Sequence, residues 1–87
     1  MKRNDLYVLA IGKYGTTAQQ LKLLEEMSEL SKEIIKGLLD EVDRSNLIDE
    51  VSDVEIVLEQ LKLMHSIGED VRRRKKWKKK RLEKRLL

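Results

Sequence analysis

The sequence predicts an all-α fold from three observations. The chain contains no proline and 40% of its residues are charged, a composition that favours long helices. It has no phenylalanine and a single tryptophan, so leucine, isoleucine, valine and methionine supply nearly all of the core, which suits a helix bundle. Its apolar residues recur mainly at helical spacing, and no turn-bounded pair of strand patterns is visible. At 87 residues the chain is long enough for one domain, 1–87.

The first predicted helix covers residues 5–14. Leu6, Leu9 and Ala10 recur at helical spacing, and we expect them to face inward, with Tyr14 as a further candidate. Gly15 follows and is expected to end the helix, because glycine adopts the backbone conformation of a helix C-terminus without strain.

The second predicted helix covers residues 17–39. Thr16 with Gln19, or Thr17 with Gln20, has the spacing of a capping box, in which first-turn side chains satisfy free backbone N–H groups. The apolar arc of this helix takes in Leu21, Leu23, Leu24, Met27, Leu30, Ile34, Ile35 and Leu38.

The third predicted helix covers residues 46–66, and Ser45 or Asn46 is expected to cap it. Residues 40–46 form a short polar connection, so the second and third helices should lie antiparallel. At about 100° per residue, one face of the third helix is apolar. This stripe consists of Leu47, Val51, Val54, Val57, Leu58 and Leu61.

The last predicted helix, 70–87, carries most of the positive charge. From Arg72 to Arg85 there are 11 basic residues and one acidic residue, Glu83, whereas residues 1–71 hold 8 basic and 15 acidic residues, a net charge of −7. An acidic body with a basic arm fits a site that binds a metal and a polyanion together, and it also fits a nucleic-acid-binding tail. Trp77 is expected to anchor this helix to the core, and the alternative is that it stacks on a nucleic-acid base.

The remaining composition narrows the class of protein. The absence of cysteine excludes disulfides and thiolate metal sites. The apolar run from Leu6 to Ile11 is too short for a signal peptide or a membrane span, so we expect a cytoplasmic protein with no membrane partner. Because a chain this short buries only a modest core, we expect a homodimer or homotetramer to complete it.

Two acidic pairs stand out as a candidate metal site. Glu26 and Glu29 are three residues apart on one predicted helix, as are Glu50 and Asp53 on the next, so antiparallel packing can bring four carboxylates together. Glu50 interrupts the apolar stripe, and a carboxylate facing a core is costly unless it is paired or bound to metal. An all-oxygen cluster suits Mg²⁺ or Mn²⁺. The alternatives are ordinary exposed acidic residues, or a structural ion pair at Glu50. We expect four other acidic residues to be solvated: Glu25, Glu33, Glu55 and Glu59.

The same residues resemble the MazG-type nucleotide pyrophosphohydrolases, members of the all-α NTP pyrophosphatase superfamily. The family signature is ExxE, a spacer and ExxD; here it reads Glu26-x-x-Glu29, twenty residues, and Glu50-x-x-Asp53. The context Gln20–Leu30, QLKLLEEMSEL, adds to the resemblance. The resemblance implies a helical bundle completed by homo-oligomerisation, and Mg²⁺ bound by the four acidic positions. It also implies cleavage of nucleoside triphosphates to a nucleoside monophosphate and pyrophosphate.

The resemblance extends to the basic helix, where Lys78-x-x-Arg81-Leu82 is similar to the C-terminal helix of small members and would bind substrate phosphates. Glu29 and Glu50 are both candidates for the general base that takes a proton from water. The main rival is a helical module that binds nucleic acid through the basic segment. The acidic body and the lack of a sequence-reading motif make it the less favoured hypothesis. A third hypothesis is a structural helical dimer, which leaves Glu50 unexplained.

Overall fold

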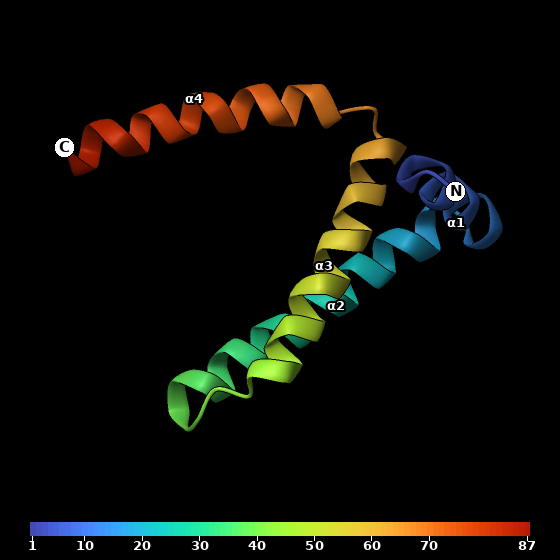
Figure 1. The fold of residues 1–87 in the computed structure, drawn as a ribbon. Coiled ribbons are helices and arrows are strands. Elements are labelled where there is room, and N and C mark those ends of the chain that lie inside the picture. Colours follow the sequence, from blue (N-terminus) through green and yellow to red (C-terminus); the bar gives the residue numbers. More distant parts are fainter.

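The computed structural model of residues 1–87 consists of four helices and no strand, which confirms the all-α prediction (Figure 1). The helices are α1 (Arg3–Tyr14), α2 (Thr16–Leu39), α3 (Arg44–Met64) and α4 (Gly68–Leu86). The two longest, α2 and α3, pack side by side as an antiparallel hairpin, as predicted. α1 lies across the open end of this hairpin, and α4 projects away from it.

The turn between α2 and α3 is tighter than predicted. Asp43, rather than Ser45 or Asn46, caps α3, and its side chain accepts a hydrogen bond from the backbone N–H of Asn46 at 3.1 Å. A Cβ atom at Gly37 would lie 3.1 Å from Cγ2 of Val42, so the absence of a side chain lets the turn fold back onto α2. The connection is therefore short enough to hold the two helices in register.

A regular seam runs between α2 and α3. The buried and half-buried residues along the inner side of α2 are spaced alternately by four and three positions, the pattern of two helices packed nearly parallel or antiparallel. They are Gln19, Leu23, Glu26, Leu30, Glu33 and Gly37. The corresponding residues of α3 are Leu47, Glu50, Val54, Val57, Leu61 and Met64. The seam therefore contains three carboxylates among its apolar side chains.

Only one edge of the apolar arc of α2 faces α3. Within that arc Leu23 is buried and Leu30 is half-buried. The other members are exposed, from 48% for Met27 to 80% for Leu38. We call five of them, Leu24, Met27, Ile34, Ile35 and Leu38, the outer face of α2. Within one chain this face has no partner.

The start of α2 departs from the predicted capping box. Gly15, with φ of +92°, both ends α1 and precedes α2, and neither threonine caps the helix through its side chain. Because the helix already begins at Thr16, both threonines lie inside its first turn. The Gln19 side chain instead donates to Oε1 of Gln60 on α3 at 2.7 Å, and both glutamines are buried. This bond fixes the register at the end of the hairpin nearest α1.

The basic helix α4 begins after a sharp bend at Ser66, whose φ is +53°. It contacts α3 and no other helix, and none of its residues is buried. Trp77 is 54% exposed, so the prediction that it anchors α4 to the core is wrong. None of the four helices is both long and apolar enough to cross a membrane.

Candidate metal centre

Three of the four predicted metal ligands converge in the structure. Glu26 comes from the seam of α2, and Glu50 and Asp53 come from consecutive turns of α3. Each offers a carboxylate oxygen, and these oxygens all lie within 4.8 Å of one another. The antiparallel hairpin produces this arrangement, because Gln19 opposite Gln60 sets a register in which Glu26 lies near Asp53.

Glu50 has the most unusual environment of the three carboxylates in the cluster. Its Oε2 atom is buried and has no hydrogen-bond partner. Loss of solvent raises the pKa of the Glu50 carboxyl above its ordinary value of 4.5, and four surrounding carboxylates, those of Asp53, Glu26, Glu29 and Glu33, raise it further. A buried oxygen without a donor is costly, and a bound cation would satisfy it.

The alternative in which Glu50 forms a structural ion pair does not occur in the structure. The nearby ion pairs are all within α2: Lys22 with Glu26 at 3.4 Å, Lys32 with Glu29 at 3.2 Å, and Lys36 with Glu33 at 3.8 Å. No lysine or arginine reaches Glu50 or Asp53. The α3 half of the cluster is thus uncompensated negative charge.

Glu29 lies beside the cluster rather than in it. It is exposed, with its Oε1 atom 3.2 Å from Nζ of Lys32, and it is not among the three converging carboxylates. It is near enough for its charge to raise the pKa of Glu50. The structure therefore places the predicted fourth ligand at the solvent side of the site.

Glu33 is a further carboxylate near the cluster, outside the three that converge. We expected it to be solvated, but it is half-buried, and its Oε1 atom has no hydrogen-bond partner. The signal was present in the sequence: Gln19, Glu26 and Glu33 recur every seven residues, which places them on one side of α2. Its negative charge contributes to the raised pKa of the Glu50 carboxyl.

The donor set fits a small hard cation. Around an octahedral Mg²⁺ with oxygens at about 2.1 Å, two ligands on opposite sides are about 4.2 Å apart. Ligands at adjacent positions are only about 3.0 Å apart. The three carboxylate oxygens, which lie within 4.8 Å of one another, therefore have to move closer together to bind one ion. Carboxylates without nitrogen or sulfur ligands are the donors that Mg²⁺ and Mn²⁺ prefer. Three protein ligands leave further positions for water and phosphate oxygens.

The predicted phosphate-binding residues lie elsewhere. Lys78 and Arg81 are on α4, which contacts only α3 and projects from the end of the hairpin where α1 lies (Figure 1). The Arg81 guanidinium lies 4.9 Å from the centroid of the Trp77 ring, an intrahelical cation–π contact. Within one chain, neither residue is brought to the carboxylate cluster. Comparison with known proteins gives no match among family models, curated proteins or solved structures.

Proposed function

We propose that the chain is a Mg²⁺-dependent nucleoside triphosphate pyrophosphohydrolase of the MazG type, which releases a nucleoside monophosphate and pyrophosphate. One observation carries the proposal: three carboxylates at the ExxE and ExxD positions converge from two helices, around an oxygen of Glu50 that is buried and unpartnered. The spacing of the two motifs supports the reaction type, and the absence of a basic partner at Glu50 supports a cation as the missing partner.

Each acidic residue has a role in this proposal. Glu26, Glu50 and Asp53 hold the cation. A Mg²⁺ ion held there would supply positive charge to neutralise the triphosphate and a site at which water is oriented. Of the two candidates for general base, Glu29 is favoured over Glu50. Glu29 is outside the converging set and is paired only with the exposed Lys32, so its carboxylate is not committed to the cation and can accept the proton of the attacking water.

We further propose that the active form is a homodimer or homotetramer. The outer face of α2 exposes five large apolar side chains on one side of the helix. Such exposure is costly in water and is typical of an interface. For Lys78 and Arg81 to hold substrate phosphates, α4 of one copy has to reach the cluster of another, because α4 does not contact its own α2. Assembly would then complete both the core and the site.

The test is a panel of ribo- and deoxyribonucleoside triphosphates incubated with Mg²⁺, with pyrophosphate and orthophosphate measured separately. We expect pyrophosphate release that Glu50→Gln abolishes. Glu55→Gln is the matched control, because Glu55 is an exposed carboxylate on the same helix and outside the cluster. Orthophosphate as the first product, or equal loss of activity in both variants, would contradict the proposal.

A further inference from the structure

The helix α4 is the most isolated element of the molecule. It has 19 residues, so it is about 28 Å long, and it touches only α3 near its start. None of its residues is buried, and its C-terminal end lies far from the rest of the chain (Figure 1). From Arg72 onward every residue of α4 is exposed, so this part of the helix is available to a partner on every side.

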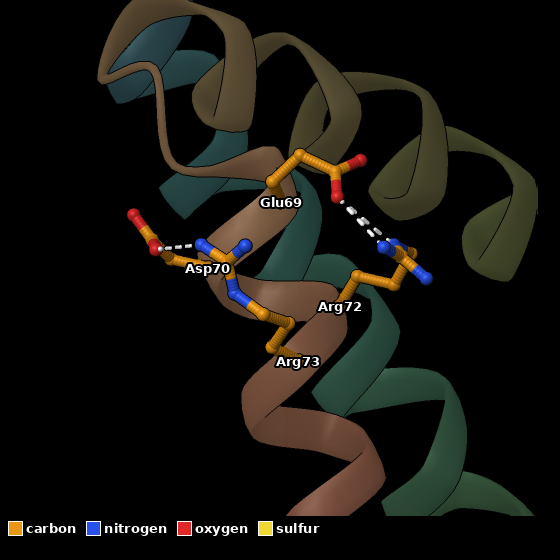
Figure 2. A network of polar contacts seen from close by, with 4 residues as sticks. All are labelled: Glu69, Asp70, Arg72 and Arg73. Atoms are coloured by element: carbon orange, nitrogen blue, oxygen red, sulfur yellow. Dashed lines mark hydrogen bonds and ion pairs between the residues drawn. The ribbon is translucent and has the colours of Figure 1, made fainter.

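The positive charge of α4 is concentrated in its distal part. Figure 2 shows that the first turn neutralises two arginines: Arg72 lies 2.8 Å from Glu69, and Arg73 lies 2.8 Å from Asp70. The hydrogen bonds from Arg72 hold the pKa of the Glu69 carboxyl below its ordinary value, so this pair stays charged. Beyond it, the segment Arg74–Arg85 contains nine basic residues and one acidic residue, and none of them forms an ion pair. We call this segment the cationic arm.

The cations surround the arm instead of lining one face. At about 100° per residue, the basic side chains leave no gap wider than roughly 60° around the helix axis. They are Arg74, Lys75, Lys76, Lys78, Lys79, Lys80, Arg81, Lys84 and Arg85. The arm lacks the apolar face that a membrane surface requires, because Trp77 and Leu82 are roughly 140° apart on the same projection. A partner that matches this arm presents negative charge on more than one side of a helix.

We propose that the cationic arm binds the major groove of duplex DNA without sequence specificity. An α-helix with its side chains is about 10–12 Å across and the major groove is about 12 Å wide, so the groove admits the arm between two rows of phosphates. Cations on opposite sides of the helix then face both strands. The body of the chain, residues 1–71 with a net charge of −7, is repelled by the DNA, so a projecting arm is the part that can enter. This proposal does not rest on the proposed hydrolase activity, and it requires an α4 that is not held against the cluster of another copy.

The test is fluorescence anisotropy of a labelled 20-base-pair duplex with the full chain, between about 50 and 200 mM salt. The variant Lys79→Gln with Lys80→Gln removes two cations of the arm, and Arg72→Gln with Arg73→Gln is the matched control that removes two paired cations. We expect the first variant to lower the slope of log K against log salt by about 2, and the control to leave it nearly unchanged. No binding near 50 mM salt, or equal slope changes in the two variants, would overturn the proposal.

Two further experiments distinguish duplex binding from other functions of α4. Stacking on single-stranded bases would require Trp77, and losing a stacked aromatic weakens such binding by roughly fivefold or more. We therefore expect Trp77→Leu to leave the affinity for duplex unchanged, and we expect duplex to outcompete single-stranded DNA. A large loss of duplex affinity in Trp77→Leu, or a preference for single strands, would overturn the proposal. We also expect Glu50→Gln to leave DNA affinity unchanged. If millimolar nucleoside triphosphate displaces the duplex from the wild type and not from Glu50→Gln, the arm serves the substrate instead.

Discussion

Truncating Leu24 on the outer face of α2 should weaken the proposed homodimer strongly while changing the single chain little. Leu24 is 62% exposed. Full burial of a leucine is worth about 1.5–3 kcal/mol, so covering the exposed part in an interface is worth about 1–2 kcal/mol. A two-fold interface contains the residue twice, which gives about 2–4 kcal/mol. Leu24→Ala should therefore raise the dimer Kd by roughly 30- to 700-fold.

Sedimentation equilibrium over a dilution series measures this Kd directly. Leu9→Ala is the matched control, because Leu9 is a leucine of similar exposure, 57%, on α1, outside both α4 and the outer face of α2. We expect the control to dimerise like the wild type. A wild-type chain that is a folded monomer at micromolar concentration, or a Leu24→Ala chain with an unchanged Kd, would refute the argument that α2 is covered by a second copy.

The remaining predictions concern the charges and the buried amides. Folding favours protonated Glu50, so the metal-free chain should lose stability as pH rises from 4.5 through the raised pKa. Glu50→Gln should accordingly raise the Tm of the metal-free chain at neutral pH, but not below pH 4.5. The same substitution should remove the rise in Tm that Mg²⁺ gives the wild type. Identical Tm profiles of the variant and the wild type would contradict both expectations. Gln60→Leu should lower the free energy of unfolding, measured in urea, by about 1–3 kcal/mol, because it leaves the buried Gln19 amide without its hydrogen-bond partner. Adding Gln19→Leu should recover most of that loss. Replacing Lys78 and Arg81 with alanine should raise KM for triphosphates more than it lowers kcat; an unchanged KM would remove both from the substrate site.

The helices and their breaks could be predicted because they depend on local sequence. Gly15 and Gly68 mark the ends of apolar periodic segments, and all four helices lie within a few residues of their predicted bounds. Glu50 could be identified because α3 has a narrow apolar stripe, and an acidic residue inside a narrow stripe has to face a partner helix. The caps were wrong because several polar residues near each helix start compete for the same role. The choice of Asp43 over Ser45 depends on where the turn closes on Gly37.

The orientation of α2 could not be predicted from its own pattern. Its apolar arc is wider than the surface that α3 covers, so a helical projection does not tell which edge is inside. The edge of the arc that includes Leu23 packs against α3, whereas Leu24 and the rest of the outer face of α2 are exposed. Glu26 and Glu33 follow Leu23 to the inside, which explains why Glu33 is half-buried and not solvated. The position of Lys78 is set by the bend before α4, and the spacing of residues along the sequence does not indicate the direction of that bend.

The most direct test of the hydrolase proposal is hydrolysis of a nucleoside triphosphate in ¹⁸O-labelled water with Mg²⁺, followed by mass analysis of the products. Attack on the α-phosphorus, with the cation held by Glu26, Glu50 and Asp53, places the label in the nucleoside monophosphate and leaves the pyrophosphate unlabelled. Labelled orthophosphate would show attack on the γ-phosphorus. That result, or the absence of any hydrolysis from a folded oligomer with Mg²⁺ bound, would contradict the proposed reaction.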